Sequence, residues 1–411
     1  MLIEFTVGNY LSFKDKKTLS LEAAAIKDNP ENIIMAGKCK LLRSAVLYGA
    51  NSSGKSNLIK AIEKMLEMIE NSGKRSSTDE LNIIPFLLSD ETEQQPSYFE
   101  MLFLIDDIRY RYGFEADKKA IHSEWLFESK GNKEITLFIR QRDAIEVTND
   151  FEEGKGLEEK TRDNALFLSV VDQFNGTIAR KIIEWFNRQI VLSGIQHESK
   201  RGLTSLFLSD SNPSYNSLVK DFLNPLNLGF NDIELTKSEK VGNEKVLTSH
   251  NKYDKSGNII GKCEFQLIEQ ESSGTNKLYD MAGYLVIGLK MGRLIIIDEL
   301  DAKLHPLLTM AIIKLFNSTE HNKDNAQLIF ATHDTNLLNY GCFRRDQIYF
   351  TEKNQLEATD LYSLVEYREA GGKKVRNDRS YEKDYISGRY GAIPYVGDFS
   401  KLYSNGKNSK D

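Results

Sequence analysis

One eight-residue stretch constrains the fold of this chain more than any other. GANSSGKS, residues 49–56, follows the apolar run 45–48 and precedes a helix-forming segment at residues 57–62. It matches the spacing G-x-x-x-x-G-K-[ST] in full, and such a loop between a strand and a helix cradles phosphate groups. Its glycines let the backbone approach oxygen atoms closely, and N–H groups at the helix start face the anion. The stretch therefore predicts a nucleotide site in an α/β fold.

The polar residues of this loop have expected partners on a nucleotide. Lys55 is expected to reach the β- and γ-phosphates, and the Ser56 hydroxyl to ligate Mg²⁺. The residues predicted to contact the nucleotide here are Gly49, Asn51, Ser52, Ser53, Gly54, Lys55, Ser56 and Asn57. The alternative is a chance glycine-rich turn, which the strand before the loop and the helix after it disfavour.

A second apolar run ends in carboxylates. In LIIIDELD, residues 294–301, four apolar residues lead into Asp298 and Glu299. A buried parallel strand delivers such residues to its carboxyl end, where ligands bind in open α/β sheets. We predict that Asp298 holds Mg²⁺, directly or through water, and that Glu299 polarises the water that attacks the γ-phosphate. The alternative is a buried strand that ends in a solvated acidic turn.

Two shorter motifs follow the same logic. Residues 271–275, ESSGT, precede a predicted helix, and small hydroxyl and glycine residues at a helix start form an anion cradle. His333 follows the apolar strand 327–331, where it can hydrogen-bond the γ-phosphate or the attacking water. Alone, these residues would more often be a helix cap and a satisfied strand-end histidine. Their order along the chain favours the functional interpretation.

The order of predicted elements indicates the fold class. Residues 98–116 are expected to form two strands around Asp106-Asp107, and strands alternate with helices from residue 293 onward. Alternation implies a parallel sheet covered on both faces. We predict an α/β fold with a mixed or parallel sheet, an antiparallel flank and a small, largely helical insertion. The predicted parts are an N-terminal lobe (1–150), a helical lid (151–245), a C-terminal lobe (246–370) and a tail (371–411).

Composition argues against several classes of protein. The 411 residues carry a net charge of -6, which argues mildly against a surface coated by nucleic acid. No run of about 20 apolar residues is present, and the N-terminus lacks a signal-peptide pattern, so we expect no membrane contact and a cytoplasmic location. The basic runs are expected to be solvated loop charge, and the cysteines to be reduced. The basic residues are Lys74, Arg75, Lys373, Lys374 and Arg376, and the cysteines are Cys39, Cys263 and Cys342.

The order of the motifs resembles the ATP-binding-cassette (ABC) superfamily, in particular its RecF, SMC, Rad50 and OLD branch. By this resemblance GANSSGKS is the Walker A motif, ESSGT the signature, LIIIDE Walker B, Leu300-Asp301 the D-loop and His333 the switch histidine. The opening FTVGNYLSFKD is also similar, which would place Lys14 near the adenine or ribose. LHP (304–306) and YISGRYGAIPYVGDF resemble the Abi-like ATPases of abortive-infection and anti-phage operons.

The chain departs from the superfamily pattern at three points. Ser273 stands where transporters and SMC proteins have glycine, and no secure glutamine loop is present, since Gln94 and Gln95 lie in a polar turn. The stretch 117–245 is too short and irregular for a long coiled coil. The resemblance therefore implies a compact ABC ATPase head with a small lid.

The same resemblance implies a mechanism. Two heads would enclose two ATP and Mg²⁺ units, with Ser272, Ser273, Gly274 and Asp301 completing the nucleotide contacts between subunits. Glu299 and His333 would be the catalytic residues. ATP would favour the closed homodimer or higher homo-oligomer, so the output is a change of shape. No Asp-x-Asp pair follows His333, so we expect no complete Toprim nuclease in this chain but a separately encoded effector, such as a nuclease.

Two other functions stay open at this stage. One is a RecF-type repair ATPase that binds DNA directly, and the other is a slow, ATP-locked scaffold that cages a partner. The tail adds a further choice, since its tyrosines alternate with basic residues. They could form a docking strip or pack at the edge of the head, and we favour packing. The tyrosines are Tyr381, Tyr385, Tyr390 and Tyr395.

Overall fold

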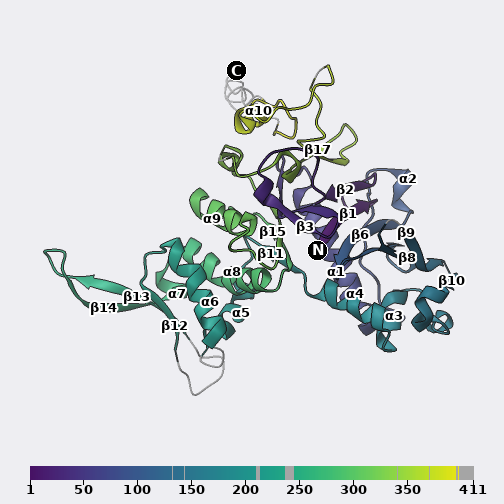
Figure 1. Cartoon of the computed structure of the whole chain (residues 1–411), viewed down its shortest axis with the longest axis horizontal. Helices are drawn as coiled ribbons and strands as arrows, with labels where there is room; N and C mark the ends of the chain where they lie inside the picture. Colours follow the sequence, from purple (N-terminus) through teal and green to yellow (C-terminus); the bar gives the residue numbers. More distant parts are fainter. Residues whose placement is uncertain are drawn as a thin grey trace, which may run out of the picture.

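Two sheets of different type organise the chain (Figure 1). The computed structural model describes residues 1–131, 133–142, 144–209, 213–236, 245–339, 341–369, 371–394 and 397. Within these residues, the core sheet has the order β11 (Ile190–Ser193), β15 (Leu294–Asp298), β16 (Gln327–Ala331), β5 (Ser44–Tyr48), β17 (Ile348–Lys353) and β18 (Thr359–Ser363). Its neighbours pair in parallel except for β17 and β18. The predicted parallel sheet is therefore confirmed.

The second large sheet is antiparallel throughout. Its order is β10 (Ala144–Val147), β9 (Lys133–Gln141), β8 (Ile121–Lys130), β7 (Ile108–Ala116), β6 (Ser97–Ile105), β1 (Leu2–Gly8) and β2 (Lys17–Ser20). The predicted pair of strands at residues 98–116 is confirmed as β6 and β7. Asp106 and Asp107 both have positive φ, 47° and 64°, as a two-residue hairpin turn requires. This sheet is the predicted antiparallel flank.

Helices cover both faces of the core sheet. The α-helices of the described chain are α1 (Lys55–Asn71), α2 (Asp90–Glu93), α3 (Phe167–Gln173), α4 (Thr177–Asn187), α5 (Arg201–Leu208), α6 (Pro213–Leu223), α7 (Leu267–Gln270), α8 (Ser273–Lys290), α9 (Pro306–Asn317) and α10 (Tyr381–Ile386). Alternate residues of β15 point to opposite faces, because side chains alternate along a strand. Ile296 joins the core under α1, whereas Ile295 and Ile297 join the core under α8 and α9. Burial on both faces explains the apolar runs of these strands.

The segment predicted as a lid divides between two places. Helices α3 and α4 pack on the antiparallel sheet, where Trp185 stacks on Phe103 with ring centroids 4.3 Å apart. Strand β11 lies in the core sheet. Only α5 and α6 belong to the arm that projects in Figure 1, together with β12 (Asp232–Leu235), β13 (Val246–Tyr253) and β14 (Ile259–Gln266). The limits 151 and 245 therefore differ from those of the arm, because helical periodicity does not reveal which body a helix packs on.

The tail packs on the head, as favoured from the sequence. Tyr385 and Tyr390 are buried and lie against Phe350 of β17, with ring centroids 5.3 Å and 5.6 Å away. Tyr381 is partly buried against the same core. Tyr395 lies outside the described residues. A small antiparallel hairpin, β3 (Ile33–Ala36) and β4 (Cys39–Leu42), forms a separate two-stranded sheet.

In the described part of the chain, no helix combines the length and apolar character needed to span a bilayer. The cysteines at positions 39, 263 and 342 are all free thiols.

Candidate functional site

The loop 49–56 joins β5 to α1, as its motif predicts. Gly54 precedes the first helical residue, Lys55, whose side chain folds back over the loop. The Lys55 ammonium donates hydrogen bonds to the carbonyls of Gly49 at 2.7 Å and Ala50 at 3.2 Å. Its side chain therefore spans the concave side of the loop, where an anion would meet the helix N-terminus.

Both glycines of the loop are required by close packing. Gly54 has φ +118°, which L side chains rarely adopt, and a Cβ there would lie 2.3 Å from Thr359 Oγ1. A Cβ on Gly49 would lie 2.4 Å from the carbonyl oxygen of Thr351. The spacing of the motif thus reflects two points where strands β17 and β18 press against the loop.

Hydroxyl groups from distant parts of the chain hold the loop in shape. The hydroxyls of Ser53 and Thr351 are 2.6 Å apart, and the Thr359 hydroxyl donates to the Ser53 carbonyl at 2.9 Å. Asn57 donates to the Ser12 hydroxyl at 2.8 Å, and Ser12 in turn lies 2.8 Å from Thr359 Oγ1. Ser12, Thr351 and Thr359 could not be predicted from the sequence, because no local motif marks residues that meet the loop only in three dimensions.

A cavity of about 330 Å³ lies over the loop. Its lining combines the loop with two residues from other strand ends: Asn51, Ser52, Ser53, Gly54, Lys55, Ser56, Asn57, Glu299 and His333. Glu299 follows β15 and His333 follows β16, and these strands are neighbours in parallel register. The carboxyl ends of parallel strands meet at one edge, which is why residues far apart in sequence share this cavity.

The carboxylates beside the cavity are arranged for a cation. Asp298 Oδ1 is buried and has no hydrogen-bond partner among the described residues. Burial lowers the pKa of Lys55, and the negative charges of Asp298, Glu299 and Asp301 oppose this shift. No cluster of three or more His, Cys, Asp or Glu residues suited to a metal occurs in the described chain. Mg²⁺ suits such a site, because it takes one or two protein ligands together with substrate phosphates.

His333 reaches the cavity from the end of β16. Its backbone N–H donates to the Asp301 carboxylate at 3.3 and 3.4 Å, which fixes the start of the segment after β16. Burial and the nearby Lys55 lower the pKa of His333, while the three carboxylates oppose that shift. A neutral imidazole offers one donor and one acceptor nitrogen at neutral pH.

The ESSGT segment lies elsewhere. The Ser272 hydroxyl caps α8 by accepting a hydrogen bond from the Thr275 N–H at 3.1 Å. Neither Ser272, Ser273 nor Gly274 is among the residues that line the cavity over the loop. Ser273 lines a second cavity, of about 280 Å³, together with Arg201 and other polar residues. The structure therefore does not bring this segment to the phosphate loop of the same chain.

Three weaker sequence features also lie away from the cavity. Lys14, predicted near the adenine or ribose, pairs with Glu91 at 3.1 Å and is not a lining residue. Gln94 and Gln95 follow the short helix α2 and do not line the cavity either. Asp301 contacts His333 rather than the loop.

The residues present fit a magnesium nucleotide. Lys55 and the N–H groups of the loop would hold the phosphates, and Ser56 with the unpartnered oxygen of Asp298 would hold Mg²⁺. Glu299 would orient a water, and His333 would contact the terminal phosphate or that water. The roles of these five residues and of the loop N–H groups stay predictions.

Replacing Gly54 with alanine is expected to lower nucleotide affinity at least about tenfold, because the new Cβ displaces Thr359 or distorts the loop. Gly202, in α5, is the matched control, since a Cβ there meets nothing within 4 Å. Titration calorimetry with ATP and Mg²⁺ measures both variants. Equal affinities would show that the tight packing of Gly54 does not shape the site.

Known proteins place this geometry in a family. A model of the family described as "AAA domain, putative AbiEii toxin, Type IV TA system" matches residues 44–339, well over half of the chain. No curated protein matches the chain significantly. Among solved structures, the SMC head domain from Thermotoga maritima is similar at 11% identity and a TM-score of 0.43, covering 88% of this chain and 98% of that one. The Smc head domain of Pyrococcus furiosus bound to the C-terminal domain of ScpA is similar at 14% identity and a TM-score of 0.41, covering 88% and 96%.

These structural similarities are too distant to carry an argument, whereas the family match covers the phosphate loop, the carboxylates and His333. The chain therefore belongs to this AAA-domain family.

Proposed function

We propose that this chain is a cytoplasmic ATP-hydrolysing switch: two copies enclose two nucleotides, and the closed pair controls a separate effector in anti-phage defence. The observation that carries the proposal is the split of the motif residues between two places. Glu299 and His333 share the cavity over the phosphate loop, whereas Ser272 and Gly274 lie outside it at the start of α8. A complete site then needs the signature segment of a second copy.

The chain's own residues would divide the work of the switch. Lys55 and the loop N–H groups grip the phosphates of the nucleotide in their own copy, while Ser272 and Gly274 grip those of the partner's nucleotide. When bound, ATP with Mg²⁺ supplies the cleavable phosphate and the charge that joins the copies. Glu299 orients the attacking water, and loss of the contact with the signature opens the pair. ATP thus shifts a two-state equilibrium by contacts made only in the closed state.

The defence role rests on the family description, which names an AbiEii toxin and a type IV toxin–antitoxin system. We propose that the effector is a separate protein, such as a nuclease. Ion pairs within the basic runs disfavour the RecF-like alternative, because they offset positive charge that DNA would otherwise contact. Arg75 pairs with Glu67, and Arg376 pairs with Asp378. Lys74 also lies 3.6 Å from Glu70, so neighbouring carboxylates offset the positive charge at residues 74 and 75.

Light scattering on the purified wild-type chain tests the proposal. Addition of ATP and Mg²⁺ is expected to double the molar mass or more, and EDTA to reverse this. A mass that stays at one chain in both conditions overturns the proposal. A gel shift at low salt with duplex DNA separates the alternatives, because tight ATP-dependent binding favours repair. Pairing without measurable phosphate release favours the ATP-locked scaffold.

A further inference from the structure

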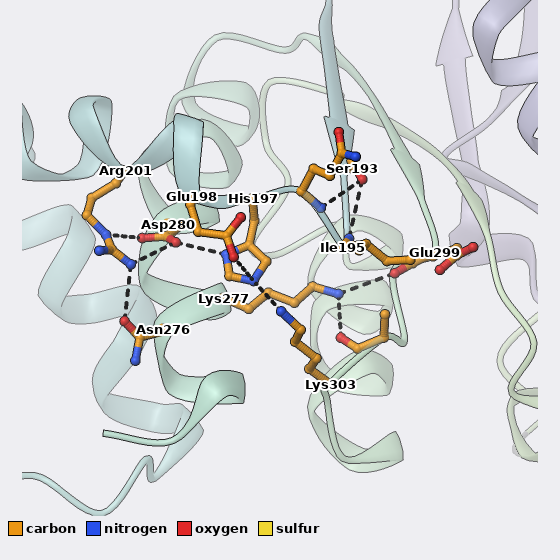
Figure 2. Close-up of polar contacts among 12 residues, drawn as sticks. Ser193, Ile195, His197, Glu198, Arg201, Asn276, Lys277, Asp280, Glu299 and Lys303 are labelled. Atoms are coloured by element: carbon orange, nitrogen blue, oxygen red, sulfur yellow. Dashed lines mark hydrogen bonds and ion pairs between the residues drawn. The ribbon is translucent and has the colours of Figure 1, made fainter. Parts of the chain in front are cut away.

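One buried side chain of α8 holds the turn that follows β15. This turn, residues 299–303, is called the D-loop turn below. Lys277 has no exposed surface, and its ammonium donates to the carbonyls of Ala302 at 2.7 Å and Leu300 at 2.8 Å. It also donates to the Glu299 carbonyl at 3.3 Å (Figure 2). An ammonium has three donors, and here all three end on the same short turn.

The charge of Lys277 is balanced in an unusual way. It forms no ion pair within the described residues, so carbonyl dipoles alone solvate the ammonium. Burial lowers its pKa to about 8, with Asp301 and Glu299 opposing this shift and Lys303 reinforcing it. An apolar side chain would avoid the cost of burying this charge. The lysine fixes the position of the turn through its three hydrogen bonds, and a methionine at this position could not make them.

The D-loop turn is strained and tightly packed where Lys277 holds it. Glu299 and Lys303 have positive φ, 53° and 62°, although neither is glycine. Such conformations persist only where their surroundings enforce them. Gly194, after β11, closes the other side: its N–H donates to the Asp298 carbonyl at 2.7 Å, and a Cβ there would lie 1.9 Å from the Glu299 carbonyl oxygen.

The far end of the turn is tied to the same helix through a histidine. Lys303 Nζ lies 3.4 Å from His197 Nε2, and His197 Nδ1 lies 2.8 Å from the buried carboxylate of Asp280 in α8 (Figure 2). Because an ammonium only donates, Nε2 accepts and Nδ1 carries the proton given to Asp280. Arg201 donates to the same carboxylate at 2.6 Å. Helix α8 therefore holds the D-loop turn at two points.

The start of α8 also touches this turn. A Cβ on Gly274 would lie 2.7 Å from the Lys303 carbonyl oxygen, so the signature segment and the end of the turn are in direct contact. Ser272 is the N-cap of α8, and Lys277 follows it by five residues in the same helix, which corresponds to roughly 7.5 Å along the axis. A shift of the helix start is thus passed to Lys277 and to the backbone of Glu299.

We propose that Lys277 is a positioning residue that ties the signature segment to the backbone of Glu299. Engagement of Ser272 and Gly274 by the partner's nucleotide then sets the position of the Glu299 carboxylate in the same chain. The two nucleotide sites are coupled through this lysine. The inference rests on the proposed function, because it needs a nucleotide shared between two copies.

Steady-state ATPase kinetics of Lys277→Met test the inference. The variant keeps the length of the side chain and removes the donors. Its kcat is expected to fall on the order of 10²-fold with unchanged KM, because the base is misplaced while the nucleotide contacts survive. The Hill coefficient for ATP is expected to exceed 1 in the wild type and to fall to 1 in the variant. Lys290→Met, at the exposed end of the same helix, is the matched control.

A second variant applies the same test without altering the lysine. Gly194→Ala places a Cβ against the Glu299 carbonyl and Lys277, and it is expected to lower kcat with unchanged KM, whereas Gly202→Ala keeps wild-type kinetics. The inference is overturned if Lys277→Met or Gly194→Ala folds and keeps the kcat and the Hill coefficient of the wild type. It is also overturned if the wild type itself has a Hill coefficient of 1. If the wild type hydrolyses ATP and pairs, the proposed function survives that result. If the wild type does neither, the proposed function itself fails.

Discussion

Lys55→Ala is expected to abolish measurable ATP binding, with affinity lowered on the order of 10²-fold or more. The lysine is 5% exposed and lies in the bend of the phosphate loop, where its ammonium now uses the Gly49 and Ala50 carbonyls. Charge-assisted hydrogen bonds contribute about 1.5–3 kcal/mol each, and alanine supplies neither charge nor donor. Filter binding with labelled ATP and Mg²⁺ measures the loss.

The control for this variant is Lys60→Ala. Lys60 is exposed on the same helix α1, so it tests for general loss of positive charge near the site. Its affinity for ATP is expected to match that of the wild type. Unchanged binding by Lys55→Ala, with the fold intact by circular dichroism, would falsify the assignment of the phosphate loop.

Glu299→Gln is expected to preserve ATP binding and to lower the rate of hydrolysis on the order of 10²–10⁴-fold, the usual range for loss of a general base. The amide keeps the size of the side chain and leaves the backbone contacts of residue 299 with Lys277 and Gly194 in place. Since the nucleotide is not consumed, the closed pair accumulates. Phosphate release and light scattering with ATP and Mg²⁺ measure the two effects.

Two comparisons make this result specific. Glu320→Gln changes an exposed glutamate after α9 and is expected to leave both rate and mass unchanged. Normal turnover by Glu299→Gln would show that another group is the base. A variant that binds ATP, does not hydrolyse it and still runs as a single chain would remove the basis for the paired switch.

The residues predicted at the nucleotide site could be found from the sequence because their motifs are local. The loop 49–56 needs only a strand, two glycines and a helix start, and each of these is visible within about twenty residues. The acids and His333 could be placed together because parallel strands end at one edge of a sheet. Predicted strands β5, β15 and β16 form that edge in the structure.

Other parts of the site had no local signal. Thr351 and Thr359 hold the phosphate loop from β17 and β18, which no motif connects with residues 49–56. Lys277 looked like an ordinary helical lysine until its ammonium met the D-loop turn. The place of β11 within the predicted lid segment 151–245 had no local signal either, since this strand joins the core sheet by pairing with a strand about a hundred residues away.

By itself, the sequence determined the strand–loop–helix unit at residues 44–71 and the strand ends that carry the predicted site residues, because backbone conformation, glycine placement and strand ends are short-range properties. Only the tertiary structure decided that the signature segment lies outside its own chain's cavity, and that α8 is bonded through Lys277 to the backbone of Glu299. Those contacts join residues that are far apart along the chain. They depend on how sheets and helices pack around two shared cores, and a linear pattern of residue types does not encode that packing directly.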